Sequence, residues 1–377
     1  MKITNLKNRT VIREGFLSLV LGLLLVWSSA GCGLLQPAVS TIAPAPTAST
    51  TPPLETRTLT MPPSPTALPA TATLLPSLTP EPSLTSTPDP YAPWTIETLL
   101  KRSYGGGEIQ DEQTLAVTSA FTRTLISYPS DGLKIYGFMN EPKGEGPFPL
   151  IIAIHGYIDP AIYQTLDYTT GNADALARAG FMVIHPNLRG YFPSDSGENL
   201  FRVGMAEDIL NLIQIVKDTG GKPGVLAKAD PDSIGLWGHS MGGGITTRVV
   251  TVNPDVKAAV LYGAMSGDER RNYEAINRWS NGLRGLEELA VPQDALPRIS
   301  PINFLDQIQA AISIHHGGSD ELVPLAWSLE TCERLQTLKK TVECFTYDGQ
   351  PHTFSGDGGE LFNQRVIDFF NRYLVPQ

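Results

Sequence analysis

The segment GHSMG at residues 238–242 restricts the fold more than any other part of the chain. The apolar run Ile234–Trp237 comes directly before it, and residues 244–252 directly after it form a predicted helix. A sharp turn from a strand into a helix needs glycines, because they permit strained dihedral angles and close backbone approach. In such a nucleophile elbow the hydroxyl of Ser240 projects at the N-terminus of the helix. A glycine-rich packing turn is the alternative interpretation.

The chain from residue 94 to 377 alternates short apolar runs with amphipathic segments. Predicted strands are 121–128, 133–139, 149–155, 181–185, 233–238, 258–262, 311–315 and 342–347, and the other predicted helices are 172–179, 202–218, 325–338 and the C-terminal segment that contains residues 362–373. The turn at 129–132 joins the first two strands, which we expect to pair antiparallel. Alternating strands and helices predict the α/β class, with a mostly parallel sheet covered by helices on both faces.

Residues 265–306 interrupt this alternation. The segment is polar, contains several prolines and glycines, and carries several arginines, among them Arg270, Arg271, Arg278 and Arg284. An insertion between two strands at this point should lie over the C-terminal edge of the sheet. We therefore predict a small lid-like insertion within a single domain.

A serine hydroxyl is a poor nucleophile unless a base lies beside it. The chain has six histidines, and five of them lie in or next to predicted strands or beside the serine. His239 precedes Ser240 and should turn away from it. His352 alone follows every predicted strand, in a loop before the last helix. In enzymes with the order Ser, Asp, His along the chain, the base occupies this place. A surface histidine is the alternative.

The acid should follow the strand before that. Asp320 lies between the predicted strand 311–315 and a predicted helix, where its carboxylate could accept the imidazole proton and fix the tautomer of the base. Glu321 and Asp348 are the competing carboxylates. A helix-capping aspartate is the other alternative, and the two roles are compatible.

Two backbone amides are candidates for an oxyanion hole. The first belongs to Met241, the residue after the serine, and the second to Tyr157, which follows a strand that ends in His155-Gly156. The loss of one such donor typically lowers the rate about 10²- to 10³-fold. The neighbouring loop with Arg189 is better explained as structural.

The N-terminal residues have the features of an export signal. Four basic residues precede an apolar run at 16–27, and small residues come directly before Cys32. This pattern resembles a bacterial lipobox and predicts a signal peptide at 1–31 with lipidation of Cys32, although Ser29 stands where Leu is commonest. An ordinary secretory signal or an uncleaved anchor is the alternative. All three place the domain outside the cytoplasm, either at the cell surface or in the periplasm.

Residues 32–93 differ in composition from the rest of the chain. Fifteen of the 31 prolines lie between Pro37 and Pro93, among Thr, Ser and Ala and very few charges. Such a segment buries too little apolar surface to offset its ordering entropy. We predict an extended, disordered tether between Cys32 and the domain.

Charge and motifs limit the partners. Removal of residues 1–31 takes four basic and one acidic residue from totals of 28 and 38, so the mature chain has a formal charge of −13. An acidic chain of this kind does not favour nucleic acid. Neither a zinc motif of the HExxH kind nor a phosphate-binding loop is present, so the sequence predicts no metal and no cofactor.

Apart from Cys32, the chain has only Cys332 and Cys344. A disulfide between them would close a loop of about a dozen residues and contribute roughly 3 kcal/mol in the chain-entropy model. Two free buried thiols are an equal alternative, since spacing does not establish the geometry.

Three segments together resemble the catalytic domain of the prolyl oligopeptidase family and dienelactone-hydrolase-like esterases. They are the serine turn at 238–242, HGGSDELVP at 316–324 and PHTF at 351–354. The resemblance covers about residues 120–377. It implies an α/β-hydrolase fold with an eight-stranded sheet, and a triad of Ser240, Asp320 and His352.

The resemblance also has a departure. Large members of the family carry an N-terminal β-propeller that filters peptides, whereas a tether and a short segment precede the domain here. This favours hydrolysis of carboxylic esters or small amides, and GHSMG is commoner among esterases and lipases. The alternatives are a peptidase for short peptides and a non-catalytic binding module.

Overall fold

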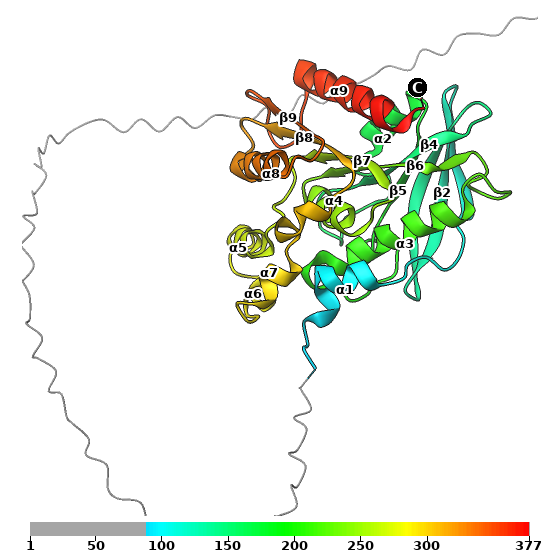
Figure 1. Ribbon diagram of the computed structural model, residues 1–377. Helices are drawn as coiled ribbons and strands as arrows, with labels where there is room; N and C mark the ends of the chain where they lie inside the picture. The colour runs from blue at the N-terminus through cyan, green and yellow to red at the C-terminus, as the bar shows by residue number, and fades with distance from the viewer. Residues whose placement is uncertain (1–87, 377) are drawn as a thin grey trace, which may run out of the picture. The chain divides into compact units, whose positions relative to one another are not determined.

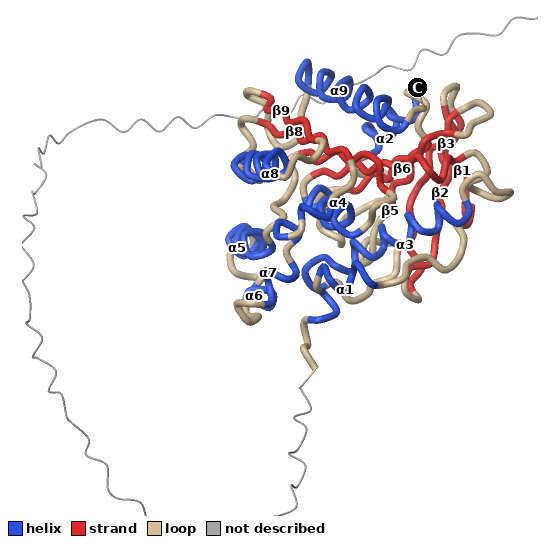
Figure 2. The backbone as a smooth tube through the Cα atoms, in the orientation of Figure 1, coloured by secondary structure: helices blue, strands red, loops and turns tan. Residues whose placement is uncertain are grey.

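The computed structural model describes residues 88–376, and these build one nine-stranded sheet with helices on both faces (Figures 1 and 2). The strands are β1 Gln110–Val117, β2 Phe121–Ser130, β3 Leu133–Pro142, β4 Phe148–Ile154, β5 Met182–Pro186, β6 Ala229–His239, β7 Val256–Tyr262, β8 Ala311–Gly317 and β9 Val342–Tyr347. Their order across the sheet is β1-β2-β3-β5-β4-β6-β7-β8-β9. The predicted signal peptide, Cys32 and most of the predicted tether lie outside the described residues.

The sheet is antiparallel at one end and parallel through the rest. β1, β2, β3 and β5 pair antiparallel, and every pair from β5 across to β9 is parallel. The implied count of eight strands is one too low, because β1 was not predicted. Its sequence, QDEQTLAV, is polar, and most of its residues are exposed at the sheet edge.

Helices cover the two faces of the sheet in separate sets. The helices are α1 Ile96–Lys101, α2 Thr170–Arg178, α3 Val203–Thr219, α4 Met241–Val252, α5 Glu269–Trp279, α6 Leu286–Leu289, α7 Ala295–Ile299, α8 Leu325–Thr337 and α9 Gly356–Leu374, with short 3₁₀ turns η1 Ala92–Trp94, η2 Leu200–Arg202, η3 Pro301–Asn303 and η4 Leu305–Gln307. Figure 2 shows α2 and α9 on one face and α1, α3, α4 and α8 on the other. No helix within residues 88–376 combines the length and apolar character needed to cross a bilayer.

Alternating side chains of the central strands divide the core into two clusters. In β4, Ile152 and Ile154 pack in the cluster with α3 and α4, whereas Ile151 and Ala153 pack in the cluster with α2 and α9. Strand residues point to opposite faces in turn, so a strand covered on both faces is apolar throughout. This explains why β4 could be predicted from its uninterrupted apolar run.

The segment predicted as a lid-like insertion contains α5, α6, α7 and two 3₁₀ turns. Its base is tied to the domain by the buried carboxylate of Glu269, which bonds to Arg202 and, at 2.5 Å, to Arg248 of α4. Arg248 also donates to the carbonyl of Ile299 at 2.7 Å. Removal of one partner from a buried charge cluster is strongly destabilising, so these contacts fix the base of the insertion.

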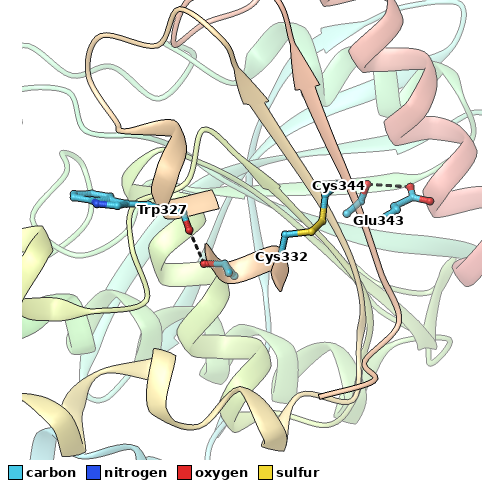
Figure 3. Close-up of a disulfide and its surroundings, with 6 residues drawn as sticks. Trp327, Cys332, Glu343 and Cys344 are labelled. Carbon is cyan, nitrogen blue, oxygen red and sulfur yellow. Dashed lines mark hydrogen bonds between the residues drawn. A yellow bond between two sulfur atoms is a disulfide. The ribbon is translucent and has the colours of Figure 1, made fainter. Parts of the chain in front are cut away.

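Cys332 of α8 and Cys344 of β9 form a disulfide (Figure 3), so of the two alternatives that the sequence left open, the structure has the bonded one. Their Cα atoms lie 6.4 Å apart, within the range for a disulfide. The bond joins the helix that follows the predicted acid to the strand that precedes the predicted base.

Candidate active site

Ser240 occupies the turn between β6 and α4. Its dihedral angles are φ 56° and ψ −118°, a region that few residues with a side chain adopt. The turn is held by backbone hydrogen bonds from Ser240 N–H to the carbonyl of Tyr262 at 2.9 Å and from Met265 N–H to the carbonyl of Ser240 at 3.0 Å. The predicted nucleophile elbow is therefore present in its geometry, with a partly exposed serine at its tip.

Close packing around Ser240 leaves no room for side chains at Gly238 and Gly242. A Cβ atom on Gly238 would lie under 3.0 Å from the Thr246 hydroxyl oxygen, and one on Gly242 would lie under 3.0 Å from the carbonyl oxygen of Ile154. Real Cβ atoms essentially never lie so close to another atom, so a side chain at either position would force its surroundings to shift. Each glycine thus lets α4 pack directly on the strands beneath it.

His352 and Asp320 form a hydrogen-bonded pair. The imidazole Nδ1 lies 2.7 Å from the carboxylate Oδ2, and the other carboxylate oxygen accepts the amides of Leu322 and Val323 at 2.9 and 2.8 Å. Because a carboxylate oxygen accepts, Nδ1 carries the proton and Nε2 is left free to take one. Asp320 thus caps the following turn and orients the imidazole, the two roles that the sequence allowed together.

Asp320 is held in its charged form. Burial raises its pKa, but hydrogen bonds from His316, His352 and the Val323 amide outweigh burial and place the pKa well below its ordinary value. The competing carboxylates Glu321 and Asp348 are both exposed. Asp320 is ionised and its side chain is buried, so it can stabilise an imidazolium on His352.

Contacts with the residues around Ser240 place His352 beside the elbow. The ring of His239 lies 4.6 Å from the ring of His352, centroid to centroid, and its Nε2 lies 2.9 Å from the His352 carbonyl oxygen. A Cβ on Gly263 would lie 3.2 Å from His352 Nδ1. Among residues 88–376 no hydrogen bond joins the Ser240 hydroxyl to His352; in many free enzymes such a bond tightens only when substrate binds.

His239 makes contacts that the sequence did not predict. It packs against His352, and its Nδ1 lies 2.8 Å from the hydroxyl of Tyr168. Burial and the neighbouring His352 lower the pKa of His239 to about 3, so the ring is neutral. Its Nε2–H donates to the His352 carbonyl, and its Nδ1 accepts from Tyr168, which fixes the backbone of the proposed base.

The two predicted oxyanion amides lie close to Ser240, one in the chain and one in space. Met241 is the first residue of α4, and Tyr157 follows β4. Within the described chain neither amide donates to a loop carbonyl or to a side chain. The loop of Tyr157 lies against the elbow, since a Cβ on Gly156 would be 3.1 Å from the Cβ of Ser240. Both predicted oxyanion donors are therefore free to bind a developing negative charge.

The insertion contacts this loop through Arg284. Arg284, in the loop between α5 and α6, donates to the hydroxyl of Tyr157, and its guanidinium lies 5.3 Å from the centre of that ring. The tip of the insertion thus touches the residue that carries one candidate oxyanion amide. Whether the insertion acts as a lid stays a prediction.

Other residues that the sequence singled out are structural or do not form a site. Arg189 is buried and pairs with Asp208 at 2.8 Å, as its structural interpretation requires. His315 is buried between the Ser313 hydroxyl and the Tyr347 hydroxyl, at 2.8 Å from each. Among residues 88–376, no group of three or more His, Cys, Asp or Glu side chains could hold a metal ion.

The fold and these contacts define the class of the protein. Residues 149–283 match the family model described as the alpha/beta hydrolase fold. A Synechocystis protein named as a carboxymethylenebutenolidase is 25% identical over 252 residues, which cover 64% of this chain and 89% of the relative. A Bacillus subtilis protein named as an uncharacterized peptidase is 26% identical over 234 residues, which cover 61% of this chain and 85% of the relative.

Solved structures agree on the fold. A puromycin-hydrolyzing peptidase of Mycobacterium tuberculosis superposes with a TM-score of 0.56 at 21% identity, over 69% of this chain but only 41% of the peptidase. Acetyl xylan esterase 1 from Thermoanaerobacterium superposes with a TM-score of 0.55 at 17% identity, over 74% of this chain and 92% of the esterase. The chain has the α/β-hydrolase fold, and the protein is a hydrolase similar to both esterases and peptidases of this class.

Proposed function

We propose that this protein is a lipid-anchored, extracytoplasmic serine hydrolase that cleaves carboxylic esters or small amides through an acyl-enzyme on Ser240. The observation that carries the proposal is the buried Asp320–His352 pair beside the strained turn of Ser240. No other described histidine has a carboxylate on Nδ1 and an Nε2 without a hydrogen-bond partner.

The reaction proceeds in two steps. Ser240 Oγ attacks the substrate carbonyl carbon while His352 Nε2 takes the hydroxyl proton, and the oxyanion binds the amides of Met241 and Tyr157. His352 then gives the proton to the leaving alcohol or amine, and the acyl group stays on Ser240. A water molecule, deprotonated by the same imidazole, attacks the acyl carbon and releases the acid.

Esters are the favoured substrates. The Synechocystis relative, aligned over most of its own length, is named as a carboxymethylenebutenolidase, another name for dienelactone hydrolase, and a lactone is a cyclic ester. The relative named as a peptidase supports short peptides as the second candidate.

The proposed location rests on two features. The N-terminal residues carry a basic segment, an apolar run and small residues before Cys32. The disulfide between Cys332 and Cys344 supports export, because structural disulfides persist in oxidising compartments. A pulse with radiolabelled palmitate tests the anchor: a labelled wild type and an unlabelled Cys32→Ala variant support it, and equal labelling contradicts it.

A fluorophosphonate probe tests the activity. We expect labelling of the wild type and none of Ser240→Ala, with an unchanged melting temperature. Absence of labelling in the wild type would favour a binding module instead. Turnover of p-nitrophenyl esters and of dipeptidyl anilides is then compared by kcat/KM, and a higher value for the anilides would replace the esterase by the peptidase.

A further inference from the structure

A second imidazole contacts the carboxylate of the proposed acid. His316, in β8, is 1% exposed, and its Nε2 lies 3.2 Å from Oδ2 of Asp320. This is the same carboxylate oxygen that accepts the proton of His352. Burial of this kind excludes water as a partner, so the neighbours of His316 decide which nitrogen carries its proton.

The hydrogen bonds of His316 fix its tautomer. Besides Asp320, its Nε2 faces the carbonyl oxygen of Val323 at 3.0 Å, and its Nδ1 lies 2.7 Å from the hydroxyl of Ser328 in α8. Both partners of Nε2 are acceptors, so Nε2 carries a proton and donates. Ser328 can donate to Nδ1, and the neutral ring then satisfies every polar atom around it.

We propose that His316 is a positioning residue of the hydrolase, which shares its Nε2 proton between the carbonyl oxygen of Val323 and Asp320 Oδ2 and thereby sets the orientation and the basicity of His352. The inference rests on the proposed function, since it assigns a role beside the same triad. It goes beyond that function because the predicted triad consists of Ser240, Asp320 and His352 and gives His316 no role.

The geometry explains what the second donor does. The amides of Leu322 and Val323 hold Oδ1, while His316 and His352 share Oδ2. With four donors on two oxygens the carboxylate cannot rotate without the loss of a buried hydrogen bond, which is costly. His316 also draws part of the negative charge of Oδ2, so it weakens the stabilisation of a charged His352.

The other titratable groups near His352 are on neighbouring elements. The ring of His239 in β6 packs directly against His352, whereas Tyr168 and Tyr262 lie close enough to Asp320 for its negative charge to act on them. Burial and the charge of Asp320 raise the pKa of both tyrosines, so both are uncharged at neutral pH. A substitution at position 316 therefore acts on His352 through Asp320.

The test compares two replacements of His316 in the full chain. His316→Leu removes the donor, and His316→Gln keeps an N–H at a similar place. Misplacement of a catalytic group by about 1 Å can lower the rate about 100-fold, and we expect His316→Leu to lower kcat for a p-nitrophenyl ester about tenfold or more. The acid limb of its kcat/KM–pH profile should move up by about half a pH unit, because Asp320 then gives its full charge to His352. His316→Gln should keep most of the wild-type kcat and a nearly unmoved acid limb.

A buried histidine next in the chain supplies the matched control. His315 points to the opposite face of β8 and contacts neither Asp320 nor His352. His315→Gln removes a histidine of equal burial, so we expect at most a change in melting temperature and an unmoved pH profile. An equal shift of the acid limb in His315→Gln and His316→Leu would overturn the proposal, as would an unchanged profile in His316→Leu.

A second measurement does not need turnover. In a Ser240→Ala background, NMR titration of the His352 ring should give a midpoint that moves to higher pH when His316→Leu is added. An unmoved midpoint rejects the role of His316 even if esterase activity is present. A moved midpoint in a protein whose turnover does not depend on Ser240 would sustain the inference about His316 and reject the proposed function.

Discussion

Loss of the disulfide between α8 and β9 should lower the stability of the domain by a calculable amount. The two cysteines are 12 positions apart. A cross-link over a loop of this length removes unfolded-state entropy worth about 3 kcal/mol at 25 °C. At about 2.1 cal/mol/K per residue, a domain of roughly 290 residues unfolds with an entropy near 600 cal/mol/K. The expected decrease in melting temperature is therefore about 5 °C.

The assay is thermal unfolding followed by circular dichroism. The perturbation is the double change Cys332→Ala with Cys344→Ala, compared with the wild type in the presence and absence of a reductant. Esterase activity at 25 °C should persist, because neither sulfur touches the proposed triad. A count of free thiols in denaturant shows whether the bond is present before the scan.

The reduced wild type should unfold at the same temperature as the alanine variant, because both lack the cross-link. The reasoning is refuted if Cys332 and Cys344 of the oxidised wild type are not free thiols and the protein nevertheless unfolds at the same temperature as the alanine variant. That result would mean that the unfolded chain is already constrained between the two positions, so that the cross-link removes no further entropy.

Three further predictions concern the site. Asp320→Asn should lower kcat by about 10⁴-fold, as the equivalent change does in serine proteases, because an amide favours the wrong tautomer of the base; kcat within tenfold of wild type would contradict this. Gly156→Ala should lower kcat/KM at least about tenfold, since the new methyl group would lie 2.7 Å from Cζ of Tyr168 and displace the oxyanion loop; unchanged kinetics would place the oxyanion site elsewhere. Burial lowers the pKa of His239 and His315 to about 3 from an ordinary 6.5, so below pH 6.5 the unfolded chain takes up protons that the folded chain refuses. The free energy of unfolding, measured in urea, should then decrease by about 1.4 kcal/mol for each pH unit by which the pH is lowered, and for each ring. His315→Gln should make this slope shallower.

Most of the fold could be predicted because its signals are local. The apolar run of β4 identifies a strand covered on both faces, and the serine turn lies between a strand and a helix that both have clear patterns. β1 could not be predicted, because its polar residues are typical of loops and its pairing with β2 is made at an exposed edge.

The candidate site was partly predictable for a related reason. The order of Ser240, Asp320 and His352 along the chain follows the order of the strands that carry them, and the structure brings Asp320 and His352 together. The contacts of His239 and His316 depend on how strand ends meet in three dimensions. For His316 the signal was its place four residues before Asp320, but strand residues of both faces look alike in an apolar run. The disulfide was undecided, since spacing alone does not give the distance between two Cα atoms.

The backbone of Ser240 has a consequence for how the protein tolerates change. Its positive φ angle suits glycine, and a side chain there costs of the order of 1–3 kcal/mol. Ser240→Gly should therefore melt at a higher temperature than the wild type, whereas Ser240→Ala should not. A variant without the nucleophile would then be more stable than the wild type. Selection for thermal stability alone would therefore favour loss of the serine at this position.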